Sequence, residues 1–88
     1  MPEQNVVVAS AHGLHARPAS LFTQAAARAG IPVTITKNGK SVNAASILGV
    51  ISLGIDHDDE VTVGAEGESA DDVVAELVAL LATDMDAE

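Results

Sequence analysis

The dipeptide Asn38-Gly39 constrains the fold more than any other short stretch of the chain. It stands between two segments of β-strand character, residues 31–37 and 40–42. A two-residue type I′ turn needs a positive φ at both central positions, and Asn-Gly is a pair that tolerates this backbone well. The two segments are therefore predicted to pair as an antiparallel hairpin.

Two further strands are expected on either side of this hairpin. Residues 5–10 form a β-branched run bounded by polar residues, and residues 60–66 alternate apolar and polar side chains. Alternation of this kind is typical of strands with one buried face. In residues 31–37 the same alternation places Thr34 and Thr36 opposite the apolar side chains, so the threonine face is expected to lie toward water.

Helical spacing of apolar residues predicts helices between these strands. A first helix is expected from residue 16, with Pro18 in its first turn and an end at Gly30. Residues 69–82 predict a C-terminal helix with Ser69 as N-cap and acidic residues in its first turn. For residues 46–54 periodicity does not separate a short strand from a short helix, but Ser46 as N-cap and Gly54 as a stop favour one or two helical turns.

The resulting order of elements is β-α-β-β-α-β-α, which indicates an α+β fold. If the first crossover is right-handed and leaves a gap that the last strand fills, the sheet has four antiparallel strands with the helices on one face. At 88 residues, without a linker or repeat, the chain is expected to be one domain spanning residues 1–88.

Composition excludes several classes of function. The chain has no cysteine, which excludes disulfides, thiol chemistry and a cysteine zinc site. Its net charge of -9, from 13 acidic and 4 basic residues, argues against a nucleic-acid partner. The N-terminus lacks the pattern of a signal peptide and no apolar run reaches the ~18 residues of a membrane span. A cytoplasmic protein without membrane insertion is expected.

Chemistry is concentrated in residues 13–20, GLHARPAS. His15 falls at or beside the start of the first helix, where Ser, Thr, Asp or Asn would serve better as a cap. The N–H groups of a helix N-terminus favour a bound anion, and the Arg17 guanidinium can fork onto phosphate oxygens. Nearby positive charge disfavours protonation of His15, which would leave a neutral nitrogen able to attack phosphorus. The segment is interpreted as a site that binds a phosphoryl group carried on His15.

Other readings of these residues are open at this point. A histidine in a loop can be a solvated side chain without a further role. His12 and His15 could suggest a metal, but two histidines without Asp, Glu or Cys at a suitable spacing form a poor site, and His57 lies far away in the sequence. No metal and no cofactor are expected, and the role of His12 is left open.

GLHARPAS, followed by NGKSVNAASILGVISLGI at residues 38–55, resembles the HPr family of phosphocarrier proteins in the bacterial sugar phosphotransferase system. The likeness covers nearly the whole chain in element order and length. It implies an open-faced β-sandwich and a cytoplasmic carrier, itself not an enzyme. Such a carrier takes phosphate from phosphoenolpyruvate-charged enzyme I and passes it to enzyme IIA units of sugar permeases. It also implies phosphorylation of His15 on Nδ1, with assistance from Arg17 and from the backbone N–H groups of Ala16 and Arg17.

The resemblance also assigns roles around Ser46. Ser46 matches a serine that many members have phosphorylated by a dedicated kinase, with a matching phosphorylase, although a plain capping serine is the alternative. The helix after Ser46 is too short to bury all of its apolar residues, so some of them are expected to form an exposed patch. The alternative is that all of them belong to the core. The residues implied in partner docking are Ile47, Leu48, Ile51, Ser20 and Gln24.

The sequence departs from the family pattern in its charge. Members often surround the site with several lysines or arginines, whereas here Arg17 and Arg28 are the basic residues expected near it and Gln24 is uncharged. Cognate partners are therefore expected to depend more on apolar contact. A monomer is expected. The alternatives are a carrier of the same fold in a regulatory phosphorelay, nitrogen-related or dihydroxyacetone-linked, and a small-ligand-binding domain in which His15 and Arg17 hold a carboxylate.

Overall fold

The computed structural model describes residues 3–10, 13, 14 and 16–83 of the chain. Within these residues the predicted order of elements is confirmed. The elements are β1 (Glu3–Val7), α1 (Ala16–Arg28), β2 (Val33–Lys37), β3 (Lys40–Asn43), α2 (Ile47–Ser52), β4 (Glu60–Ala65) and α3 (Ala70–Leu81). No helix in the described part of the chain is both long enough and apolar enough to span a bilayer.

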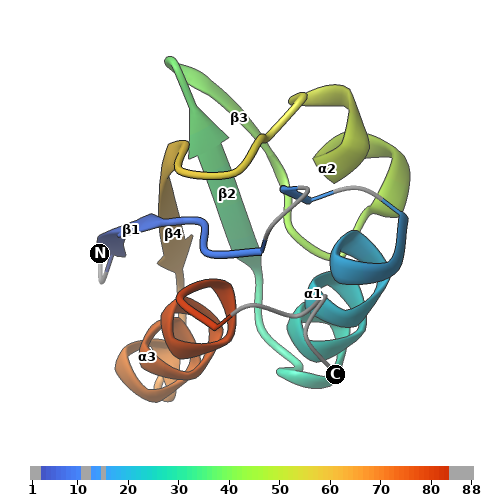
Figure 1. Cartoon of the computed structure of the whole chain (residues 1–88). Coiled ribbons are helices and arrows are strands. Elements are labelled where there is room, and N and C mark those ends of the chain that lie inside the picture. Colours follow the sequence, from blue (N-terminus) through green and yellow to red (C-terminus); the bar gives the residue numbers. More distant parts are fainter. Residues whose placement is uncertain (1–2, 11–12, 15, 84–88) are drawn as a thin grey trace.

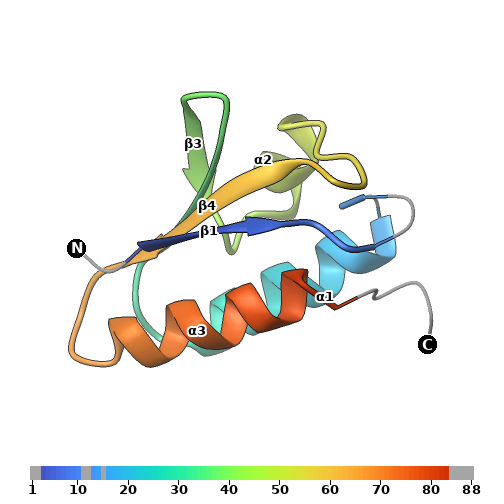
Figure 2. The same ribbon diagram turned by 60° about the vertical axis from the view of Figure 1, so that its left-hand side comes forward.

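The strands form one antiparallel sheet in the order β1-β4-β2-β3. The last strand thus fills the gap that the first crossover leaves, as predicted. Helices α1 and α3 lie side by side against one face of the sheet, and α2 packs beside α1 and against β3 (Figures 1 and 2). The helices leave the other face open, which makes the fold an open-faced β-sandwich.

The hairpin between β2 and β3 has the geometry that the sequence predicts. Lys37 pairs with Lys40, so that Asn38 and Gly39 alone make the turn, with φ values of 51° and 81°. Only a type I′ turn places both central residues in this region while matching the twist of the strands.

The core is aliphatic apart from Phe22, which is fully buried on α1. Strand alternation turns Val33 and Ile35 of β2 toward the helices, while Thr34 and Thr36 lie on the open face as predicted. On that face Thr36 and Ser41 share a hydrogen bond across the hairpin, with 2.6 Å between their oxygens.

Two details of the prediction are wrong. The first strand runs over residues 3–7 rather than 5–10, because the chain leaves the ladder after Val7 and the N–H of Val8 donates to the carbonyl of Asp59 in a loop. Ser69 occupies the N-cap position of α3, yet its hydroxyl makes no capping hydrogen bond. Its backbone, at φ -98° and ψ 16°, is not in the extended conformation that normally aims a capping side chain at the first turn.

Candidate functional site

Helix α1 begins at Ala16, directly after His15, as the sequence predicts. His12 and His15 lie outside the described residues, so the site is defined by the residues on either side of them. The first turn of α1 carries no acidic side chain, and Arg17 within it is exposed. The partial positive charge at the N-terminus of α1 is therefore not neutralised by a carboxylate of the same turn.

The segment that leads into α1 is fixed by a loop from the other half of the chain. The N–H of Leu14 donates to the carbonyl of Ile55 at 2.9 Å, and the Leu14 side chain is buried. Gly13 has a φ of +70°, and a Cβ at this position would meet the Ile55 carbonyl oxygen at 2.3 Å. Only glycine fits here without displacing backbone, so the two residues before His15 have a defined place.

The sequence did not single out Gly13, Leu14 or Ile55 as site residues. The signal that could have found Gly13 is a glycine two residues before a candidate functional histidine, where close backbone approach is a common reason for glycine. Its partner Ile55 lies in another loop, and no local pattern identifies such a contact.

The loop that contacts Gly13 and Leu14 is acidic, and one of its carboxylates, that of Asp59, is held by an ion pair and a hydrogen bond. Asp59 Oδ2 lies 2.7 Å from Lys37 Nζ and accepts a hydrogen bond from the N–H of Asp56 at 2.8 Å. The hydrogen bond from Lys37, followed by that from Asp56, holds the pKa of Asp59 below its ordinary value of 3.8. Asp59 is therefore ionised at neutral pH.

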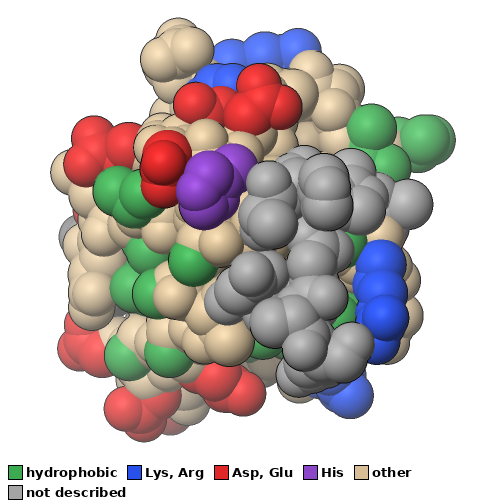
Figure 3. Space-filling view, in the orientation of Figure 1, with side chains coloured by type: hydrophobic (Ala, Val, Ile, Leu, Met, Phe, Trp, Pro, Cys, Tyr) green, Lys and Arg blue, Asp and Glu red, His purple; other side chains and the backbone are tan. Residues whose placement is uncertain are grey.

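His57 belongs to the same loop and faces residues near the site segment. Its Nδ1 lies 3.1 Å from the carbonyl oxygen of Ser10, to which it donates, and its Nε2 lies 3.4 Å from a carboxylate oxygen of Asp58. Acidic side chains gather beside it at the surface (Figure 3). In the described part of the chain no group of three His, Cys, Asp or Glu side chains could hold a metal ion.

Ser46 has the capping geometry that the sequence predicts. Its backbone is extended, at φ -97° and ψ 112°, and its hydroxyl accepts a hydrogen bond from the N–H of Gly49 at 3.1 Å. Gly49 is a further residue that the sequence did not single out. A Cβ at this position would come within 3.3 Å of both Ser46 Oγ and Val42 Cβ, so glycine lets α2 pack closely against β3.

Helix α2 buries one apolar side chain and exposes three. Val50 is fully buried, while Ile47, Leu48 and Ile51 are 38%, 78% and 45% exposed. The alternative that all of these residues belong to the core is therefore wrong. We call Ile47, Leu48 and Ile51 the apolar patch.

The neighbouring face of α1 is polar. Arg17, Ser20 and Gln24 follow one another at helical spacing, and Gln24 Nε2 donates to Ser20 Oγ at 3.0 Å. Because α1 packs beside α2, the elements that carry the predicted phosphate ligands and the predicted docking residues are neighbours.

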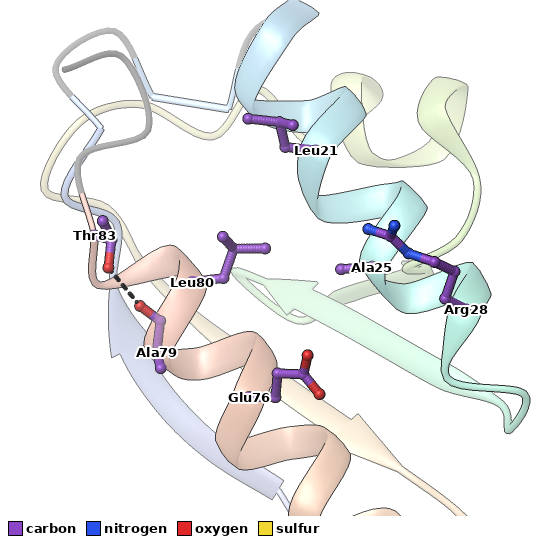
Figure 4. A pocket seen from close by; sticks show the side chains of 7 residues that line it. All are labelled: Leu21, Ala25, Arg28, Glu76, Ala79, Leu80 and Thr83. Carbon is purple, nitrogen blue, oxygen red and sulfur yellow. Dashed lines mark hydrogen bonds between the residues drawn. The ribbon is translucent and has the colours of Figure 1, made fainter. Parts of the chain in front are cut away.

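Arg28 lies elsewhere, which corrects the expectation that it accompanies Arg17 near the site. It is in the last turn of α1, about 16 Å along the helix axis from Arg17. There it lines a groove of about 430 Å³ between α1 and α3 (Figure 4). The other lining residues are Leu21, Ala25, Glu76, Ala79, Leu80 and Thr83.

Comparison with known proteins identifies the family of this chain. Residues 2–83 match the family model described as the PTS HPr component phosphorylation site. The phosphocarrier protein HPr of Streptomyces coelicolor is 46% identical over 83 residues, which cover 93% of this chain and 89% of that protein.

Solved structures of this family share the fold. The phosphocarrier protein HPr of Bacillus anthracis superimposes with a TM-score of 0.88 at 40% identity, over 91% of this chain and 95% of that one. An HPr dimer from Thermoanaerobacter tengcongensis gives a TM-score of 0.70 at 39% identity, over 91% of this chain and 92% of that one. By its family match and its fold, the chain belongs to the HPr family of phosphocarrier proteins, which are carriers of the phosphotransferase system and not enzymes.

Proposed function

We propose that the chain accepts a phosphoryl group on His15 from enzyme I, which is charged by phosphoenolpyruvate, and passes it to enzyme IIA units of sugar permeases. The bond between Nδ1 of His15 and phosphorus forms as the donor's bond to phosphorus breaks, and the reverse exchange occurs with the acceptor. The observation that carries this proposal concerns the neighbours of residue 15 in the chain: Leu14 is bonded to Ile55, and Ala16 begins the first turn of α1.

The chain's own residues account for how such a phosphate would be held. The backbone N–H groups of Ala16 and Arg17 lie in the first turn of α1, and the exposed Arg17 side chain is free to reach phosphate oxygens. A helix terminus contributes about 0.3–1 kcal/mol, and a hydrogen bond to a charged group about 1.5–3 kcal/mol. A few kcal/mol from these groups would stabilise the phosphohistidine without preventing onward transfer.

The apolar patch supports docking of both partners on one surface. A carrier has to present the same nitrogen to a donor and to an acceptor, so both must approach from the same side. Ile47, Leu48 and Ile51 offer apolar area there, and Ser20 and Gln24 offer polar contacts from α1. Exposed apolar clusters of this kind mark interaction sites.

We further propose that a kinase phosphorylates Ser46 and that a phosphorylase reverses this modification. Ser46 is half-buried and directly precedes Ile47. A phosphate there would add a charge of about -1.5 to -2 beside the patch and would oppose docking through desolvation and repulsion.

The domain extent, oligomeric state and location of the protein also belong to the proposal. The whole of residues 1–88 would act as one phosphocarrier domain, as a monomer in the cytoplasm. The dimer of the Thermoanaerobacter tengcongensis relative makes the monomer worth testing by sedimentation at micromolar concentration.

The decisive test is phosphorylation by enzyme I with labelled phosphoenolpyruvate. Wild type should take up acid-labile label, as phosphohistidine does, and His15→Ala should take up none. Acid-stable label, or label on the alanine variant, would overturn the assignment of His15. Charging by the enzyme I of a regulatory relay, but not by that of the sugar system, would overturn the assignment to sugar uptake.

A further inference from the structure

Lys37 ends strand β2 on the face that the helices cover. Strand alternation places it on the same side as Val33 and Ile35, and its side chain is only 17% exposed. Its Nζ donates to the carbonyl oxygen of Gly54 at 2.7 Å and lies 2.7 Å from Asp59 Oδ2. One ammonium group therefore joins the chain just after α2 to the residue just before β4.

Asp59 closes the loop between these two points. Its Oδ2 accepts the hydrogen bond from the N–H of Asp56, and its own N–H donates to the Asp56 carbonyl at 3.1 Å. The loop is also bonded to the chain after β1, where Val8 accepts from Asp58 at 2.9 Å and donates to Asp59 at 3.0 Å. Residues 54–59 are thus bonded to Lys37 at both ends, through Gly54 and Asp59, and to Val8 through Asp58 and Asp59.

The same loop holds the residues that precede His15. Ile55 follows directly after the carbonyl that Lys37 binds, and its own carbonyl accepts the hydrogen bond from Leu14. Gly13 lies against Ile55 and Asp56 with no space for a side chain. A continuous path of short contacts therefore runs from Lys37 through Gly54 and Ile55 to Leu14.

We propose that Lys37 is a positioning residue for phosphoryl transfer. It clamps residues 54–59 between the end of α2 and Leu14, and so fixes Gly13 and Leu14, the two residues that precede His15, relative to the apolar patch. The inference rests on the proposed function, because it assumes that His15 receives the phosphate. Asp59 is 32% exposed, so water screens the pair, and its main contribution is to local geometry rather than to global stability.

The test uses two substitutions that remove the clamp with little change in shape. Lys37→Met keeps an unbranched apolar stem and removes the ammonium, and Asp59→Asn removes the charge. Lys40→Met is the matched control, because Lys40 is the exposed cross-strand neighbour of Lys37. Lys37→Arg restores a cation and is the rescue variant.

The first readout is hydrogen exchange at the Leu14 amide, which requires no partner protein. Exchange should become about fivefold faster in Lys37→Met and in Asp59→Asn, with core amides such as that of Val63 unchanged. In the double variant, Lys37→Met with Asp59→Asn, exchange at Leu14 should be no faster than in either single variant, because both substitutions remove the same clamp. Unchanged exchange at Leu14, or equal acceleration in Lys40→Met, would overturn the clamp.

The second readout is the rate of phosphorylation by enzyme I. Lys37→Met should lower kcat about fivefold and leave KM within about twofold, because the docking residues are untouched. Lys37→Arg should recover most of kcat. A rise in KM at constant kcat, or no recovery with arginine, would overturn the positioning role.

The two readouts separate the two proposals. If wild type takes no phosphate on His15, the proposed function fails and the positioning role fails with it, while Leu14 exchange still reports whether the clamp exists. If wild type is charged normally and Lys37→Met has the same kcat, the positioning role alone is overturned.

Discussion

Helices α1 and α2 lie side by side but are held in different ways. Helix α1 has 13 residues and a face buried around Phe22, and in its first turn Arg17 is exposed and can carry charge. Helix α2 has six residues, buries only Val50, and is fastened through the Ser46 hydroxyl at one end and by Lys37 just beyond the other. A long helix can present a reactive terminus, whereas a short one leaves apolar side chains exposed for partners. We infer that the phosphate is held by the first turn of α1 and that partners bind mainly through the apolar patch of α2, with Ser20 and Gln24 of α1 adding polar contacts.

The largest expected effect is at the approach to α1. Gly13→Ala should destabilise the protein by about 3 kcal/mol, because it combines a positive φ with a clash against the Ile55 carbonyl. Urea unfolding measures this effect. Gly39→Ala is the control, with a φ of +81° but nothing within 4 Å of its Cβ, and should cost about 1 kcal/mol. Equal losses in the two variants would mean that the contact with Ile55 is not tight.

Within α2, buried and exposed residues should behave oppositely. Val50→Ala should cost about 2 kcal/mol of stability because it empties part of the core. Leu48→Ala should change the free energy of unfolding by less than about 0.5 kcal/mol, yet raise KM for enzyme I about tenfold. If Leu48→Ala lowers the free energy of unfolding as much as Val50→Ala does, the patch is part of the core and not a docking surface.

At Ser46 the structural and regulatory roles can be separated. Ser46→Ala should cost about 1 kcal/mol through loss of the cap on Gly49. Ser46→Asp and Ser46→Asn should both keep the cap, but only the aspartate adds charge beside the patch. Phosphorylation of His15 by enzyme I should slow markedly with Asp and not with Asn. Equal rates for the two would remove the electrostatic basis for control at Ser46.

The smallest expected effect is the pH dependence of the Lys37–Asp59 pair. The pKa of Asp59 is lowered in the folded protein, so the folded state binds fewer protons than the unfolded state just below the ordinary value of 3.8. The pair's contribution is therefore fully present above pH 3.8 and is lost as pH falls through the folded pKa. Urea midpoints of wild type and Asp59→Asn should differ at neutral pH and converge in acid. A difference that does not change with pH would contradict the ion pair.

Local patterns were sufficient where a few neighbouring residues determine the structure. Asn38-Gly39 determines the hairpin through its own backbone, and Ser46 determines the start of α2 through one hydrogen bond. The buried faces of β2 and β4 follow from alternation, and the exposure of the apolar patch follows from the shortness of its helix.

Contacts between distant segments could not be predicted in the same way. Lys37 and Asp59 are separated by the hairpin turn, β3, α2 and the loops around α2, and no pattern in either segment indicates that the two pair. The end of β1 depends on the bond of Val8 to a distant loop, and the missing cap depends on the backbone conformation of Ser69. The place of Gly13 against Ile55 is likewise a property of the fold, although the glycine itself was a visible signal.

The division of roles between α1 and α2 is tested most directly by steady-state phosphorylation with enzyme I, comparing Arg17→Gln with Leu48→Gln. The account predicts that Arg17→Gln lowers kcat with little change in KM, and that Leu48→Gln raises KM with little change in kcat. If both variants change the same parameter, phosphate stabilisation and partner docking are not divided between the two helices.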